Sequence, residues 1–259
     1  MTDKAAEKPA PKAATRSRKR KAEPVAPVPR SRLRTALRWF VRGLGAVAAF
    51  YAVLVLAFAV VPPPINLYQV GEAWRRGGIE KDWVSWDEIA PVMGRSAVAA
   101  EDANFCNHWG FDMAAIRDAI EAGSNRGAST ISQQVVKNVF LWHGRSWVRK
   151  AMEAVLTPVV ELVWSKQRIL EVYLNVAEFD DGVFGIQAAA QHHFGVDAKD
   201  LSALQAARLA AVLPNPKEWS PSKPSSFVKS RTRGIISGAE TIAADGRSAC
   251  FEDGSGPGD

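Results

Sequence analysis

The chain has 259 residues and a formal net charge of +6, a length that suits one sizeable domain plus an appendage. The charge is uneven, because residues 1–42 hold 13 Lys and Arg against three acidic residues, whereas residues 43–259 hold 20 against 24. A basic excess confined to one end argues against a nucleic-acid-binding domain, so we expect no nucleic-acid partner.

The N-terminal region divides into a basic tail and an apolar segment. Residues 1–38 are rich in Lys, Arg, Pro and Ala, and such a segment buries too little apolar surface to fold, so we predict a disordered tail. Residues 39–61 form the predicted transmembrane helix, because the 19 residues from Gly43 to Val61 carry no charge and span about 28 Å as a helix. The positive-inside rule puts the tail in the cytoplasm. The alternative is a signal peptide cleaved near Ala59.

The rest of the chain is predicted to be one helical domain between two less regular segments. These parts are a membrane-proximal linker at 62–84, the domain at 85–235 and a C-terminal tail at 236–259. A Ser or Thr followed three residues later by Glu or Gln is a capping box, the signature of a helix start. Three such boxes begin at Ser85, Thr130 and Ser202.

Individual prolines, glycines and acidic residues predict where single helices break or begin. Pro91 and Gly94 are expected to interrupt the first helix, before another short helix from Ala97 to Asp102. Asp112 is expected to cap a further helix. Because neither a series of alternating strands nor an internal repeat occurs in the sequence, we predict a mainly α fold.

An acidic pair, Glu101 and Asp102, follows a run of small apolar residues. Phe105 and Trp109 come soon after and can exclude water from the pair. A carboxylate beside apolar walls tends to have a raised pKa, which suits proton transfer near neutral pH. The alternative is that both acids are exposed near a helix end.

The chain between Ala122 and Met152 contains no acidic residue although the domain is slightly acidic overall. Hydroxyls and free backbone N–H groups at the helix start near Thr130 would add to an anion site. A phosphate or pyrophosphate ligand would explain this pattern, and a solvated basic face is the alternative. The cations of the stretch are Arg126, Lys137, Arg145, Arg149 and Lys150.

Several blocks of sequence together point to a known family. They are A-V-A-A-E-D-A-N-F-C-N-H-W-G-F-D, G-A-S-T-I-S-Q-Q-V-V-K-N, R-S-W-V-R-K-A-M-E-A, S-K-Q-R-I-L-E-V-Y-L-N, G-V-F-G-I-Q-A-A-A and A-V-L-P-N-P. Over about residues 80–235 the chain resembles the monofunctional biosynthetic peptidoglycan glycosyltransferases, family 51 of the glycosyltransferases. The resemblance implies a lysozyme-like large lobe with a small membrane-associated jaw. It also implies an enzyme of the bacterial inner membrane, with a periplasmic catalytic domain, that polymerises lipid II into β-1,4 glycan strands and releases undecaprenyl pyrophosphate.

The resemblance also assigns roles to individual residues. Glu101 matches the general base that takes the proton of the acceptor hydroxyl. Glu153 matches the second acidic residue, on the donor side, where a divalent ion such as Mg²⁺ or Mn²⁺, or the pyrophosphate itself, is handled. No organic cofactor is expected, and proteins of wall synthesis or division are candidate partners. The residues expected to bind substrate are Asp102, Phe105, Ser129, Thr130, Gln133, Gln134, Lys137, Asn138, Arg145, Arg149 and Lys150.

Some positions depart from the family pattern or carry no assigned role. Ala128 replaces a common glycine, Met152 a common basic residue and His193 a common tyrosine. We expect Cys106 and Cys250 to be unpaired, with a disulfide between them as the alternative in an oxidising compartment. No metalloprotease, CxxC, dinucleotide or phosphate-loop motif occurs. His143, His192 and His193 are expected at the surface or in packing, not as ligands. Two rival functions remain, a lytic transglycosylase or lysozyme-like hydrolase and a non-enzymatic wall-associated scaffold.

Overall fold

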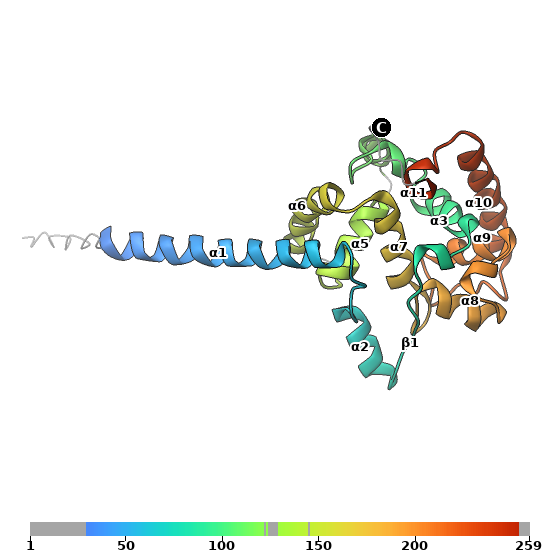
Figure 1. Cartoon of the computed structure of the whole chain (residues 1–259), viewed down its shortest axis with the longest axis horizontal. Coiled ribbons are helices and arrows are strands. Elements are labelled where there is room, and N and C mark those ends of the chain that lie inside the picture. The colour runs from blue at the N-terminus through green and yellow to red at the C-terminus, as the bar shows by residue number, and fades with distance from the viewer. Residues whose placement is uncertain (1–29, 122, 124–128, 145, 254–259) are drawn as a thin grey trace, which may run out of the picture. The chain divides into compact units, whose positions relative to one another are not determined.

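The computed structural model describes residues 30–121, 123, 129–144 and 146–253 (Figure 1). The chain forms two units that divide between Val47 and Ala48. The predictions that concern Arg126, Ala128, Arg145 and most of the basic tail lie outside the described residues.

One long N-terminal helix, α1 (Arg30–Phe58), carries the predicted membrane span. Its part from Arg32 to Phe58 has 27 residues and contains an 18-residue window with a mean hydropathy of 2.0, so the helix is long and apolar enough to cross a membrane. The helix begins before residue 39, the predicted start, because the arginines of the basic flank are good helix formers and extend it towards the N-terminus. It ends at Phe58, four residues before Pro62.

The second unit is mainly helical, as predicted. Its helices are α2 (Leu67–Arg76), α3 (Pro91–Glu101), α4 (Met113–Glu121), α5 (Ile131–Phe140), α6 (Trp147–Val163), α7 (Lys166–Val176), α8 (Ile186–Phe194), α9 (Ala203–Val212), α10 (Ser226–Ala244) and α11 (Ala249–Glu252). Within the described residues, strands β1 (Glu80–Lys81), β2 (Glu178–Asp180) and β3 (Val183–Phe184) form a small sheet in the order β1-β3-β2. The β1–β3 pair is parallel and the β2–β3 pair antiparallel. The division into a large lobe and a jaw stays a prediction.

Two groups of helices build the core and frame the site. Helices α3, α9 and α10 pack together, and α5 lies against α6 and α7 (Figure 1). Fully buried side chains such as Tyr173, Phe179 and Ile131 fill the space between elements, and this burial is the main stabilising term. The C-terminal end of α3 and the N-terminal half of α5 therefore lie on a fixed scaffold.

The start of α3 differs from the prediction. Pro91 is the first residue of the helix. At this position the backbone N–H would have no partner within the helix, so the missing N–H of proline costs nothing, and its fixed φ suits the helical turn. Gly94 lies inside the helix, and a Cβ there would come within 2.9 Å of the Trp86 side chain. Neither residue interrupts a helix, and the Ser85 capping box starts only a 3₁₀ turn, η1 (Trp86–Glu88).

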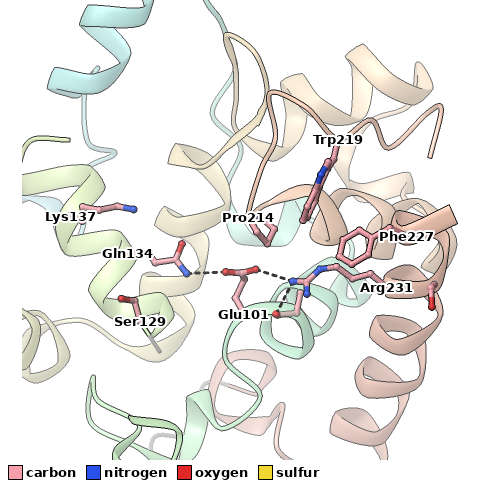
Figure 2. Close-up of a pocket in the computed structure, with 10 residues that line it drawn as sticks. Glu101, Ser129, Gln134, Lys137, Pro214, Trp219, Phe227 and Arg231 are labelled. Atoms are coloured by element: carbon pink, nitrogen blue, oxygen red, sulfur yellow. Dashed lines mark hydrogen bonds and ion pairs between the residues drawn. The ribbon is translucent and has the colours of Figure 1, made fainter. Parts of the chain in front are cut away.

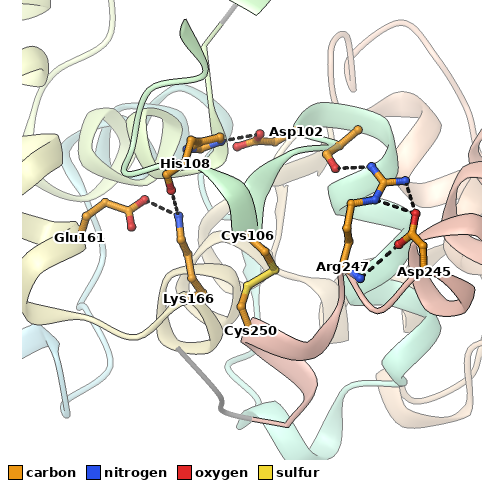
Figure 3. Close-up of a disulfide and its surroundings, with 9 residues drawn as sticks. Asp102, Cys106, His108, Glu161, Lys166, Asp245, Arg247 and Cys250 are labelled. Carbon is orange, nitrogen blue, oxygen red and sulfur yellow. Dashed lines mark hydrogen bonds and ion pairs between the residues drawn. A yellow bond between two sulfur atoms is a disulfide. The ribbon is translucent and has the colours of Figure 1, made fainter. Parts of the chain in front are cut away.

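The described part of the C-terminal region, up to Asp253, is mainly helical, although the sequence predicted a less regular tail from residue 236. The boundary predicted at residue 235 falls inside α10, whose residues Val228, Ile235 and Ile242 are buried at a spacing of seven. Beyond it, α11 is tied to the 3₁₀ turn η2 (Phe105–Asn107) by a disulfide between Cys106 and Cys250, with their Cα atoms 5.8 Å apart (Figure 3). The prediction of unpaired cysteines is wrong, because a partner 144 residues away leaves no local pattern.

The end of α1 is held by the helical unit. Trp164 Nε1 donates to the Val55 carbonyl at 2.7 Å. The Arg168 guanidinium donates to the Phe58 carbonyl at 3.0 and 3.1 Å and to the Val61 carbonyl at 2.8 Å. Carbonyls at a helix end lack partners in their own helix, so Arg168 satisfies groups that would otherwise need water.

Candidate active site

Glu101 is the last residue of α3 and faces a cavity from its edge. Its side chain is 14% exposed. Gln134 Nε2 donates to Glu101 Oε2 at 3.1 Å, and Arg231 Nη2 lies 3.3 Å from Glu101 Oε1 (Figure 2). Burial raises the pKa of the Glu101 carboxyl, although Gln134 and Arg231 act in the opposite direction. The raised pKa expected for a carboxylate in this stretch is confirmed.

The cavity beside Glu101 has a volume of about 790 Å³. Ser129, Gln134 and Lys137 line one side of it, while Trp219 and Arg231 line the other (Figure 2). A second cavity of about 300 Å³ also reaches Glu101 and is lined by Asp102, Ser129 and Thr130, among others. The carboxylate of Glu101 therefore borders two spaces that could each hold part of a substrate.

Lys137 supplies a half-buried cation to the same cavity. It lies on α5, one turn after Gln134. Burial lowers the pKa of the Lys137 ammonium, the charges of Arg149 and Lys150 lower it further, and those of Glu153 and Glu101 raise it. Lys137 thus lies within electrostatic range of both predicted catalytic acids. It is well placed to gain a partner when an anion enters.

A third cavity of about 270 Å³ continues from Gln134 and Lys137. Asn138 lines it, and Asn138 Oδ1 is buried without a hydrogen-bond partner among the described residues. His143 also lines it and stacks on Tyr68 with the ring centroids 3.9 Å apart. Burial, followed by the charge of Lys137, lowers the pKa of His143 to about 4. His143 therefore adds packing to this cationic region without adding charge at neutral pH.

Glu153 on α6 is a buried acid held between cations. Its side chain is 3% exposed, Arg149 Nη1 donates to its Oε2 at 2.7 Å, and Lys150 Nζ donates to its Oε1. Divalent Mg²⁺ prefers a nearly complete shell of oxygen ligands. Here both carboxylate oxygens face cations, and among the described residues Glu153 joins no group of three possible ligands. The donor set does not fit a metal as it stands, so we derive no step through one.

Asp102 and Thr130, which line the second cavity, also hold the framework of the site in place. Asp102 Oδ1 lies 2.8 Å from His108 Nε2, and Asp102 Oδ2 accepts from the Ile131 backbone N–H at 3.0 Å (Figure 3). Asp102 therefore joins the end of α3 to the start of α5. The predicted capping box is confirmed, because Thr130 Oγ1 accepts from the Gln133 N–H and Gln133 Oε1 accepts from the Thr130 N–H.

Two of the predicted substrate contacts are corrected by burial. Phe105 is 0% exposed and packs in the core, with Lys166 Nζ 4.4 Å from its ring centroid. Gln133 is 5% exposed and is used by the cap. Neither side chain lines a cavity described above, so both act by holding the loop and the helix in place.

Nearly all the residues that line these cavities fall within one recognised domain. Residues 69–240 match the model of a family described as transglycosylase. The chain belongs to the transglycosylase family.

Curated relatives of this transglycosylase agree with that assignment. A biosynthetic peptidoglycan transglycosylase of Jannaschia sp. (strain CCS1) is 63% identical over 214 residues, 83% of this chain and 90% of that protein. Proteins of the same name from Pseudomonas putida (strain F1) and Stutzerimonas stutzeri (strain A1501) are 53% and 50% identical, over 77% and 79% of this chain and 86% of each relative. The similarity therefore spans most of the chain and most of each relative.

Arg231 and its aromatic neighbours are the part of the transglycosylase site that the sequence did not reveal. Arg231 lies on α10, 130 residues after Glu101 in the chain. Trp219 and Phe227 line the same side, with ring centroids 5.0 Å apart. The apolar spacing of α10 could have indicated the helix, but no local signal indicates that its arginine faces Glu101.

Proposed function

We propose that this chain is a membrane-anchored peptidoglycan glycosyltransferase that polymerises lipid II into β-1,4 glycan strands and releases undecaprenyl pyrophosphate. The observation that carries the proposal is a single cavity lined by both the Glu101 carboxylate and the half-buried Lys137 ammonium. Membership of the transglycosylase family and relatives named biosynthetic peptidoglycan transglycosylase support it.

The two sides of the cavity suit the two halves of the reaction. Glu101 takes the proton of the acceptor sugar hydroxyl, and the oxygen forms a bond to the anomeric carbon of the donor sugar. The bond from that carbon to the pyrophosphate oxygen breaks with inversion, and the leaving group carries the electron pair as added negative charge. Lys137 stabilises that charge, with Arg149 and Lys150 close by. General-base help of this kind is worth about 10²–10⁴ in rate.

The direct test is incubation of the full-length protein with labelled lipid II. We expect polymeric glycan and free undecaprenyl pyrophosphate. Purified cell walls serve as the second substrate, because a hydrolase would release soluble fragments from them and a scaffold would act on neither. Wall cleavage without polymer, or no reaction with either substrate, would overturn the proposal.

The proposed location is the bacterial inner membrane, with one span, a cytoplasmic N-terminus and a periplasmic catalytic unit. Helix α1 has the length and hydropathy of a span. The Cys106–Cys250 disulfide suits an oxidising compartment, since cytoplasmic thiols are kept reduced.

The exposed apolar side of α6 supports contact of the catalytic unit with lipid. Trp147 is 91% exposed, and Val148, Val155 and Leu162 on the same helix are each exposed by 65–70%. Their spacing of seven residues places the last three on one face. We propose that this face is the membrane-associated part of the enzyme. Proteins of wall synthesis or division stay proposed partners, and a requirement for Mg²⁺ or Mn²⁺ stays a prediction.

The Lys137→Ala variant is expected to bind the donor less tightly. The substitution removes a charged partner of the pyrophosphate, and a charged hydrogen bond is worth about 1.5–3 kcal/mol, or roughly 10–100-fold in affinity. Binding of a labelled polyprenyl-pyrophosphate substrate to the full-length protein would measure this. Lys199→Ala, which changes an exposed lysine in another part of the domain, is the control. Equal affinity in wild type and Lys137→Ala would contradict the role of Lys137.

The Arg231→Gln variant is expected to change the pH profile of polymerisation. The charge of Arg231 lowers the pKa of Glu101, so its removal should raise that pKa further. Since the base must be ionised, the acid limb of the profile should move to higher pH. Arg231→Lys keeps the charge and should leave the limb close to that of wild type. An acid limb that does not move in Arg231→Gln would show that Arg231 does not tune the base.

A further inference from the structure

Three possible metal ligands gather at the small sheet, and none of them lines a cavity described above. Asp180 ends β2, and His192 and His193 lie in the last turn of α8. One ligand atom from each residue lies within 4.8 Å of the others. Asp180 Oδ2 is 3.5 Å from His193 Nε2 and 3.9 Å from His192 Nε2. In a tetrahedral zinc site, bonds of about 2.0–2.1 Å place ligand atoms about 3.3 Å apart, so small side-chain rotations suffice.

His193 is a buried imidazole with an unused nitrogen that faces Asp180. Its side chain is 3% exposed, and Nε2 has no hydrogen-bond partner among the described residues. The ring is also hydrogen-bonded to the backbone of Phe179. Because Nε2 is unpartnered, this bond uses Nδ1. A ligating histidine commonly donates its other N–H to a backbone carbonyl, which fixes the tautomer and leaves the free lone pair for the metal.

His192 has the complementary arrangement. Its Nδ1 lies 3.1 Å from Glu80 Oε2 on β1, while its Nε2 faces Asp180. A carboxylate behind a ligating histidine orients the ring and increases its basicity. The two oxygens of the Asp180 carboxylate have different partners. Its Oδ1 accepts from the Asp181 N–H at 2.7 Å, and its Oδ2 faces the two histidines.

A neighbouring cluster of three acidic residues differs from the Asp180 cluster because it is already paired with cations. Glu72, Glu178 and Asp181 are equally close together, but cations already neutralise them. Lys217 Nζ lies 3.0 Å from Glu72 and 3.6 Å from Glu178, and Arg75 Nη2 lies 2.8 Å from Asp181. Among the described residues, the ion pairs of Asp180 involve only the two histidines. The end of α8 adds a partial negative charge, which favours a cation.

We propose that Asp180 Oδ2, His192 Nε2 and His193 Nε2 bind one divalent transition-metal ion of the zinc class, with water completing the shell. Two imidazoles and a carboxylate are a typical zinc ligand set, and the same donors suit Ni²⁺ or Cu²⁺ in the order of their usual affinities. Glu80 and the Phe179 backbone would hold the ligands. The ion would join β1, β2 and α8, and so fasten the chain that follows α2 to the helical core.

The test uses the full-length protein in detergent, purified without a polyhistidine tag and freed of metal by a chelator. Titration with Zn²⁺ against a chromogenic chelator should show one saturable site per chain. His192→Ala, an exposed position, and His193→Tyr, the residue common in the family, should each weaken binding by about tenfold or more. Asp181→Asn, in the neutralised neighbouring cluster, should bind as wild type does.

Thermal melting gives a second readout that does not depend on activity. Zn²⁺ should raise the Tm of wild type and Asp181→Asn, because binding to the folded state alone stabilises it, and should raise the Tm of His192→Ala by less at the same Zn²⁺ concentration. Absence of saturable binding in wild type would overturn the proposal. So would equal affinity in wild type and His192→Ala, a variant that changes an exposed side chain and leaves the core intact.

Discussion

The Glu101→Gln variant should keep its fold and lose polymerisation of lipid II by about a hundredfold or more, since an amide cannot act as general base. Glutamine has nearly the same shape as the ionised side chain, so the partners Gln134 and Arg231 stay within reach. Initial rates with labelled lipid II, measured beside the Tm of both proteins, would separate loss of chemistry from loss of fold.

A matched control is available on α10. Glu240 is exposed, so Glu240→Gln changes the same chemical group without touching the cavity around Glu101. Its rate should equal that of wild type. A Glu101→Gln protein that polymerises at a rate close to wild type would remove Glu101 from the mechanism and leave the proposed reaction without its base.

Loss of the Cys106–Cys250 bond should lower the stability of the catalytic unit by about 2–4 kcal/mol, the usual contribution of a disulfide that closes a long loop. The bond is buried on the α11 side, where Cys250 is 7% exposed and Phe251 0%. Arg247 Nη1 also donates to the Ala103 carbonyl at 2.9 Å (Figure 3). The C-terminal region therefore holds the loop that follows Glu101 at two points. We expect a lower Tm and a looser Asp102–His108 contact.

The measurement compares oxidised wild type, reduced wild type and the Cys106→Ala/Cys250→Ala double variant by thermal melting. The reduced protein and the double variant should melt alike, below the oxidised protein. Each single variant should lose nearly as much as the double variant, because either change removes the same bond. Melting temperatures that do not differ between oxidised and reduced protein would show that noncovalent packing alone holds α11.

Local chemistry explains why several elements could be predicted from the sequence. The capping boxes at Thr130 and Ser202 are made between residues three apart, and both are present in the structure. Asp112 accepts from the Ala115 N–H at 2.9 Å, as its position before α4 predicted. The membrane-length helix followed from composition and length alone. Such features depend on interactions within one or two turns.

Contacts between distant segments explain what the sequence did not reveal. Arg231 reaches Glu101 only because α10 packs on α3, and the disulfide joins residues 144 apart. The burial of Phe105 was equally hidden, because an aromatic residue beside an acidic pair suits a cavity wall and a core position equally well. The family resemblance placed Lys137 beside the cavity but did not indicate which residues on the opposite side would face it.

The capped end of α1 has a consequence for how substrate is found. A catalytic unit on a flexible linker would sample a hemisphere of orientations, and only a fraction of them would present its opening to the bilayer. In this protein, Arg168 and Trp164 instead hold the chain between Val55 and Val61 by hydrogen bonds to its backbone carbonyls. Lipid-linked sugars diffuse in two dimensions, so we expect attachment without a flexible linker to favour encounters within the plane of the membrane.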